Sequence, residues 1–288
     1  MMRSGILFGV SSSVFWGLTP IFWKLLSEVP ARQQLALRIV FAMLLMIIVL
    51  WLRGKSLPRL KAKTIGVLLL ASMFLFVNWW MFVWAVTVDR IVDTSLAYYI
   101  NPLISVFFGV LLLGERMRRL QWIAVGLAAV GVTYLTITLG VVPWLSLAMA
   151  SSFGFYGLAK KITPEVDAFH GLAIETSWLA VGSLGMIVWW NLRGVSVFPA
   201  ADITSNLLMV VTGVVTVIPL WLFGRAANMI PLSTLGVLQY LAPTISLLVG
   251  VFLYGEQLAG DRLVGFMLVW VALALFVYDS VVELKADR

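Results

Sequence analysis

Long apolar runs without charge, separated by short charged segments, dominate the chain. The longest windows that lack Asp, Glu, Lys and Arg are residues 4–23, 64–88, 94–114, 120–159, 203–224 and 226–255. A helix needs about 20 apolar residues to cross a bilayer, and the fourth window is 40 residues long. This window therefore holds two helices, with the break at 140–143, where a glycine and a proline interrupt the apolar run.

With three weaker segments added, the pattern predicts an all-α membrane protein with ten transmembrane helices. The predicted spans are residues 5–26, 34–52, 65–86, 92–113, 120–139, 142–159, 170–190, 206–225, 232–254 and 263–281. A β-barrel is disfavoured because barrel strands alternate apolar and polar residues over about ten positions, whereas these runs are continuously apolar.

Composition narrows the functional classes. The chain is 62% hydrophobic and 11% charged, which excludes an ordinary soluble protein, and ten spans in 288 residues leave no room for a separate catalytic domain. With no cysteine and one histidine, His170, we expect no metal site, no cofactor and no catalytic residue. His170 is interpreted as a loop residue; a role in proton coupling is the alternative.

The distribution of Lys and Arg predicts the orientation. One set of loops and termini carries 14 of these residues and the other set carries five. Because cytoplasmic loops are enriched in Lys and Arg, both termini and the loop at 53–63 should be cytoplasmic. The same bias explains the net charge of +7 without a nucleic-acid partner, since the bases form no continuous stripe.

The second half of the chain repeats the first. PLISVFFGVLLLGE (102–115) and PTISLLVGVFLYGE (243–256) match at 8 of 14 positions with an offset of 141, and SSSVFWGL (11–18) matches SSFGFYGL (151–158) at five. Five helices per half is an odd number, so the second copy enters the membrane from the opposite side, as in alternating-access carriers. The alternative is that duplication only built a stable bundle.

Several segments resemble one family over nearly the full chain. These are NWWMFVWAV (78–86), SLAYYINPLISVFFGVLLLGERMRRLQWIAV (95–125), SFGFYGLAKK (152–161), PLSTLGVLQYLAPT (231–244) and GVFLYGE (250–256). They are similar to the RarD branch of the EamA transporters, in the drug/metabolite transporter superfamily. The resemblance implies two EamA-like repeats, 1–140 and 141–288, in the bacterial inner membrane, and efflux of small metabolites or drugs.

Polar and small residues form matching stripes on the fourth and ninth spans, around Asn101 and Gln239. Polar groups that face hydrocarbon are costly, so these stripes should face the bundle interior or a wet cavity; close helix packing is the alternative. Pro102 and Pro243 occupy equivalent positions, remove a helical hydrogen bond and are candidate hinges.

Aromatic residues extend the candidate substrate cavity, in which they could stack on a flat or amphipathic molecule. Core filling is the alternative for each Trp. The predicted cavity residues are Trp16, Asn78, Trp79, Tyr98, Tyr99, Asn101, Tyr156, Trp221, Gln239 and Tyr240, and Trp80 and Trp84 were grouped with them.

Two charges, Arg38 and Glu175, lie well inside predicted helices. They become equivalent when SEVPARQQLALR (27–38) is aligned with PEVDAFHGLAIE (164–175). We interpret them as gates at opposite mouths, each finding a partner on the facing repeat when its side closes; snorkelling or a local polar partner is the alternative. Glu115 and Glu256 end the matched segments and are interpreted as helix termini at the membrane surface.

The predicted function is a secondary carrier that exports small organic molecules across the bilayer. No nucleotide-binding GxxxxGK[ST] segment occurs, so ATP is not the direct energy source; proton coupling and facilitated diffusion both stay open. The alternatives are a membrane-embedded enzyme acting on lipid-linked substrates and a non-transporting sensor or chaperone. Substrate identity and oligomeric state stay open.

Overall fold

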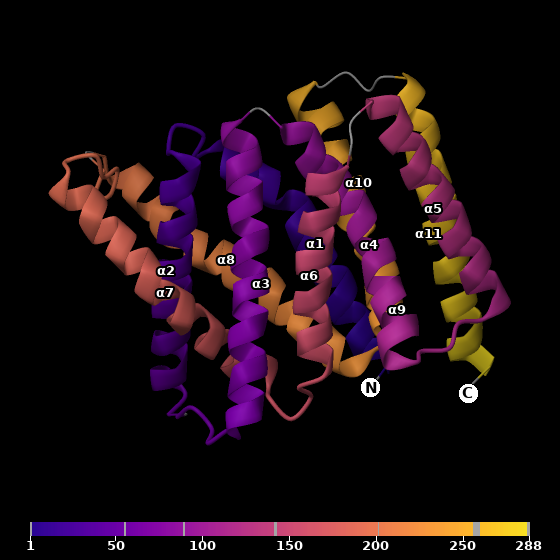
Figure 1. The fold of residues 1–288 in the computed structure, drawn as a ribbon, viewed down its shortest axis with the longest axis horizontal. Coiled ribbons are helices and arrows are strands. Elements are labelled where there is room, and N and C mark those ends of the chain that lie inside the picture. The colour runs from indigo at the N-terminus through magenta and orange to yellow at the C-terminus, as the bar shows by residue number, and fades with distance from the viewer. Residues whose placement is uncertain are drawn as a thin grey trace.

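A computed structural model gives the protein as a helical bundle (Figure 1). It describes residues 2–54, 56–88, 90–140, 143–200, 202–255 and 260–286, and these contain no strand. The helices are α1 (Met2–Lys24), α2 (Ala31–Leu52), α3 (Ala62–Thr87), α4 (Ile91–Leu113), α5 (Arg119–Leu139), α6 (Trp144–Lys161), α7 (Ala168–Leu192), α8 (Ile203–Met229), α9 (Leu232–Leu238), α10 (Leu241–Leu248), the π-helix η1 (Val249–Leu253) and α11 (Gly260–Ala286).

All ten predicted spans fall on helices, which confirms the predicted all-α membrane fold. Within the described ranges, nine helical segments are long and apolar enough to cross a membrane, with α9 to η1 counted as one. The 18-residue α6 is not among them, and two lysines, Lys160 and Lys161, lie in its last turn.

The two ends of the bundle carry different connections. The start of α1, the end of α11 and the α2–α3, α4–α5 and α6–α7 loops lie at the lower end in Figure 1, and the α1–α2 and α7–α8 loops lie at the upper end. The names lower end and upper end refer to this view throughout. Helix α2 therefore begins at the upper end and α7 at the lower end.

Helix packing joins the two halves of the chain. Helix α1 packs on α8 and α10, whereas α6 packs on α3 and α4. Helices α2 and α7 pack on each other at one side of the bundle, and α5 and α11 form a pair at the other side (Figure 1). Helix α4 packs on α9 between them. Every one of these pairs combines a helix from the first half with one from the second.

The ninth span is broken between α9 and α10, at Gln239 and Tyr240. Pro243 has no N–H with which to bond the carbonyl of Gln239 four residues earlier, and that carbonyl accepts from the N–H of Ala242 instead, at 3.1 Å. Pro102, the matched residue in the first half, lies inside the continuous α4. The two prolines thus have different local effects, and their role as hinges stays a prediction.

The packing of α4 against α9 leads to a first prediction. A Cβ at Gly236 would lie 2.7 Å from the Cβ of Ser105 and 2.9 Å from the carbonyl oxygen of Pro102. We expect Gly236→Ala to lower the free energy of unfolding by about 1–3 kcal/mol through overpacking, measured by thermal unfolding in detergent.

Gly126→Ala is the matched control. Nothing lies within 4 Å of a Cβ at this exposed position of α5, so the substitution should be neutral or mildly stabilising. Equal unfolding temperatures for the two variants would contradict the tight contact between α4 and α9.

Candidate substrate site

One face of α4 is buried against α9 over part of its length and is exposed over the rest. Tyr98, Pro102, Ser105 and Gly109 lie on this face because they are three or four residues apart. Ser105 is 2% exposed, and a Cβ at Gly109 would lie 2.9 Å from the backbone nitrogen of Ser233, so this part is sealed against α9. Tyr98, about two helical turns nearer the upper end than Ser105, is 51% exposed.

The exposed Tyr98 faces the bundle interior. Phe107 is also exposed, but nine residues separate it from Tyr98, which is two and a half helical turns, so the two side chains point in opposite directions. Tyr98 interacts electrostatically with Arg38 of α2. Helix α4 packs mainly on α6, α9 and α5, and α2 packs on α8, α7 and α3. Both side chains therefore face the space between these groups of helices.

Aromatic rings surround the guanidinium of Arg38. Its central carbon lies 4.0 Å from the ring centroid of Trp79 on α3 and 5.7 Å from that of Trp23 on α1. Its Nε is buried without a hydrogen-bond partner, and Arg38 makes no ion pair with any residue of the described chain. We call Arg38, Trp23, Trp79 and Tyr98 the Arg38 cluster. It places a cation with free N–H donors beside the open face of α4.

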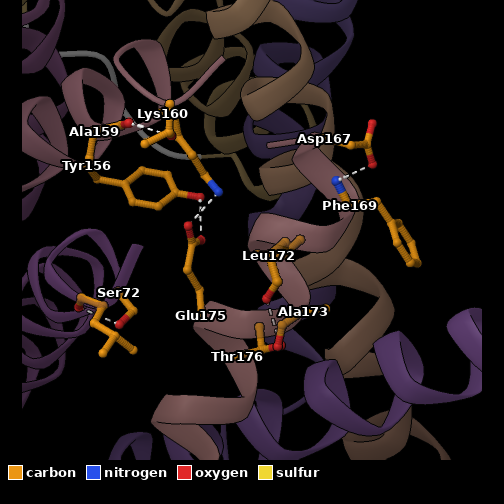
Figure 2. Close-up of polar contacts among 12 residues, drawn as sticks. Ser72, Tyr156, Ala159, Lys160, Asp167, Phe169, Leu172, Ala173, Glu175 and Thr176 are labelled. Carbon is orange, nitrogen blue, oxygen red and sulfur yellow. Dashed lines mark hydrogen bonds and ion pairs between the residues drawn. The ribbon is translucent and has the colours of Figure 1, made fainter. Parts of the chain in front are cut away.

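Glu175, unlike Arg38, has partners for its charge. It is 0% exposed, and its Oε1 forms an ion pair with Nζ of Lys160 at 2.6 Å. The Tyr156 hydroxyl donates a hydrogen bond to Oε2 at 3.4 Å. Figure 2 shows both α6 side chains pointing at this carboxylate on α7. A buried carboxylate with a cation and a hydrogen-bond donor is fully partnered.

The two candidate gates occupy equal positions in their helices. Arg38 lies seven residues after the first residue of α2, and Glu175 lies seven residues after the first residue of α7. These helices begin at opposite ends of the bundle (Figure 1). Glu175 finds its partners within its own half of the chain, and the neighbours of Arg38 also belong to its own half. A gating role for either residue stays a prediction.

Other predicted cavity residues lie in an aromatic core between α1, α6 and α8. The Trp16 ring lies 5.5 Å from Phe153 and 5.7 Å from Phe223 between centroids. Tyr156 stacks on Phe223, and Trp221 contacts Phe8. The structure thus places Trp16, Tyr156 and Trp221 among packed rings, apart from the residues of the Arg38 cluster.

The amide side chains among the candidates join the two halves. Asn78 on α3 donates to the carbonyl oxygen of Met149 on α6 at 2.8 Å. Asn101 on α4 donates to Oε1 of Gln239 at the break between α9 and α10. Asn101 Oδ1 and Gln239 Nε2 are buried without a partner. The unpaired amide atoms could bind a water or a polar group of a ligand.

The remaining candidates lie away from the Arg38 cluster. Tyr99 contacts Phe266 of α11 at 5.4 Å between centroids, and Tyr240 is buried in the same apolar cluster with its hydroxyl unpaired. Trp80 and Trp84 are 44% and 39% exposed on α3. Since adjacent helical residues differ by 100° in direction, Trp79 and Trp80 face different surroundings, as Tyr98 and Tyr99 do.

A contact at the lower end was not anticipated from the sequence. Glu115 follows Gly114, whose φ of +66° ends α4 in a left-handed turn. Glu115 Oε1 accepts a hydrogen bond from the Leu232 N–H at 2.6 Å, and Oε2 accepts from the Ser233 N–H at 2.8 Å. These are the first two residues of α9, so a carboxylate from the first half neutralises a helix start in the second. The equivalent Glu256 lies outside the described residues.

A second contact at the lower end also connects the halves. The Thr64 hydroxyl, near the start of α3, donates to Oε1 of Glu165 in the α6–α7 loop at 2.9 Å. The pKa of Glu165 lies below its ordinary value because its carboxylate accepts a hydrogen bond from its own backbone and one from Thr64. The carboxylate is therefore ionised at neutral pH, which strengthens the contact.

Membrane-length helices with charged and polar side chains on their inner faces are typical of membrane transport proteins. A family model described as "EamA-like transporter family" matches residues 3–137. A solved crystal structure of a protein 20% identical in sequence superimposes with a TM-score of 0.75 over 96% of each chain and has the same fold.

Curated relatives cover nearly the whole chain. "Protein RarD" of Streptomyces exfoliatus is 41% identical over 99% of this chain and 92% of its own. "Uncharacterized transporter YojE" of Bacillus subtilis is 39% identical over 99% and 97%, and "Protein RarD" of Escherichia coli is 37% identical over 97% and 95%. The protein is a multi-pass membrane transporter. It belongs to the RarD branch of the EamA family in the drug/metabolite transporter superfamily.

The buried ion pair generates a second prediction. Glu175→Gln leaves the ammonium of Lys160 buried without a counter-charge, which typically costs about 3–5 kcal/mol. We expect a correspondingly lower free energy of unfolding in detergent. The double variant Lys160→Met/Glu175→Gln removes both charges and should recover most of the loss. If the single and double variants were equally unstable, the ion pair would not be the cause.

Proposed function

We propose that this protein is a secondary carrier that exports small organic molecules by alternating access. The observation that carries the proposal is the change along α4: its inner face is sealed against α9 at Ser105 and Gly109, and it is open at Tyr98. A site that is open toward one end and closed toward the other is one of the two states that such a carrier needs. The Arg38 cluster lies at the open part.

The halves 1–140 and 141–288 act as inverted repeats in this proposal. The repeat makes α1 equivalent to α6, α2 to α7, α3 to α8, α4 to α9–α10 and α5 to α11. Exchanging equivalent helices converts the α1–α8 contact into the α6–α3 contact, and the α4–α6 contact into the α1–α10 contact. The opposite starting ends of α2 and α7 in Figure 1 fit a two-fold axis in the membrane plane.

Opening of the lower end requires Glu115 to leave the start of α9. Two charge-assisted hydrogen bonds must break, and the Thr64–Glu165 contact must separate with them. Rocking of one half against the other would release these contacts together and close the open face around Tyr98. The protein would then expose the same site to the opposite side of the membrane.

The proposed orientation places the lower end in the cytoplasm of a bacterial cell, across the inner membrane. The α2–α3 and α4–α5 loops at this end carry Arg53, Arg59, Lys61, Arg116 and Arg118, and cytoplasmic loops are enriched in such residues. The Arg38 cluster then opens toward the periplasm. Proton coupling and facilitated diffusion are both compatible with this arrangement.

Reporter fusions test the orientation. A reporter after Lys63, at the lower end, should be active as a cytoplasmic domain, and a reporter after Arg193, at the upper end, should be active as a periplasmic one. Activity of both on the same side of the membrane would refute the ten-helix topology.

Cysteine accessibility tests alternating access, because the chain has no native cysteine. In a wild-type background we expect Tyr98→Cys to react with a membrane-impermeant maleimide added at the periplasmic face. Ser233→Cys, whose side chain is 4% exposed beside Glu115, should be protected from the cytoplasmic face.

Adding Glu115→Gln should shift both rates in opposite directions. The Gln amide has one acceptor oxygen for the two N–H groups of α9, so the lower end opens more often, labelling at position 233 rises several-fold and labelling at position 98 falls. Glu28→Gln, at an exposed position of the α1–α2 loop, is the matched control and should change neither rate. Parallel changes at both positions would contradict alternating access.

A further inference from the structure

Arg38 differs from other charged groups inside the bundle. Arg90 pairs with Asp93, Arg118 with Asp279 and Lys160 with Glu175. Among the described residues, Arg38 has no carboxylate and no hydrogen-bond acceptor, although its Nε is buried. The cation–π contact with Trp79 offsets only part of the cost of an unpaired charge inside the bundle. The guanidinium therefore lacks an anion.

Glu175, the residue of α7 that aligns with Arg38, is a charged group with partners inside the protein. Glu175 is neutralised by Lys160 and receives a hydrogen bond from Tyr156. The alignment at offset 140 places Trp16 and Pro20 at the equivalent positions of the first half. Neither carries a negative charge. The described part of the chain thus supplies a counter-ion for Glu175 and none for Arg38, so Arg38 can take a partner from outside the chain.

The shape of the Arg38 cluster selects the chemistry of that partner. A guanidinium has a planar fork of N–H donors that matches the two oxygens of a carboxylate. The central carbon of the fork lies over the Trp79 ring, and the Nε of the fork has no hydrogen-bond partner among the described residues. Trp23 adds a second ring, and the half-exposed Tyr98 adds a hydroxyl beside the same space. These rings offer apolar faces to a flat group attached to the carboxylate.

We propose that Arg38 binds the carboxylate of the transported molecule, and that Trp79, Trp23 and Tyr98 hold its aromatic or otherwise flat body. This inference rests on the proposed transport function and names its substrate class. It assigns Arg38 an external ligand in place of a partner on the facing repeat. A cationic substrate would be repelled by Arg38, and a neutral one would leave its charge unpaired.

A matched series of probes tests the charge requirement. The purified full-length protein is titrated at millimolar concentrations with 3-phenylpropionate, its amide 3-phenylpropionamide, 3-phenylpropylamine and inorganic phosphate. Binding is followed by tryptophan fluorescence and by the unfolding temperature. We expect 3-phenylpropionate alone to quench the fluorescence and raise the unfolding temperature, because it alone combines a carboxylate with a flat apolar body.

Substitutions of Arg38 then locate the site. Arg38→Met should weaken binding of 3-phenylpropionate at least tenfold, and Arg38→Lys should weaken it less, because Lys keeps the charge without the planar fork. The ligand-free unfolding temperature of Arg38→Met should equal or exceed that of the wild type, since the variant removes an unpaired charge. Arg32→Met, at an exposed position in the first turn of α2, is the control and should bind normally.

Three results would overturn the inference: no binding of 3-phenylpropionate, equal binding of the amide, the amine or phosphate, or unchanged binding by Arg38→Met. The experiments distinguish a failure of this inference from a failure of the proposed transport function. Arg38-dependent binding without reciprocal cysteine labelling or flux into liposomes would refute transport and keep the site. Reciprocal labelling without carboxylate-selective binding would refute this inference and keep alternating access.

Discussion

The first two N–H groups of α9 donate hydrogen bonds to the Glu115 carboxylate, and these two bonds hold the lower end of the bundle together. Hydrogen bonds to charged groups contribute about 1.5–3 kcal/mol each. They fix the end of α4 against the start of α9, and Gly236 allows the two helices to approach closely above this point. In the proposed carrier, the closed part of the α4 face depends on this contact, and so does the side of the membrane to which the Arg38 cluster opens.

Arg38 and Glu175 occupy aligned positions in the two halves but have different electrostatic environments. On α7, Glu175 belongs to a buried ion pair that stabilises the α6–α7 contact. On α2, Arg38 keeps its charge among aromatic rings without a counter-ion among the described residues. Only Glu175 is compensated within the described part of the chain, and this difference is the basis for the proposed binding role of Arg38.

The sequence predicted the fold well because the bilayer imposes strong constraints. Continuous apolar runs located all ten spans, and the motifs identified the family. Contacts over long sequence distances were less predictable: Glu115 lies 117 residues from Leu232, and its side chain was interpreted only as a helix end. Both prolines were candidate interruptions by sequence, but the helix is broken only at Gln239 and Tyr240, beside Pro243, whereas Pro102 lies inside the continuous α4.

The candidate site was predicted in part. The predicted set included Arg38, Trp79 and Tyr98. It omitted Trp23, which lies near the end of the first predicted span. It also included Tyr99, whose direction differs by 100° from that of Tyr98 and whose ring contacts Phe266 of α11. Residues three or four apart, such as Tyr98, Asn101 and Ser105, share a direction that Tyr99 does not share, and a substrate-facing role of Tyr99 stays a prediction.

The most direct test of the account is a distance measurement between spin labels across the two halves. One pair, at Arg116 and Ile162, reports on the lower end, and a second, at Leu25 and Leu192, reports on the upper end; Leu25, Ile162 and Leu192 are exposed hydrophobic residues, and Arg116 is exposed too. In the Glu115→Gln background the lower distance should lengthen while the upper distance shortens. Lengthening at both ends, or at neither, would contradict a carrier whose access is set by the contact between Glu115 and α9.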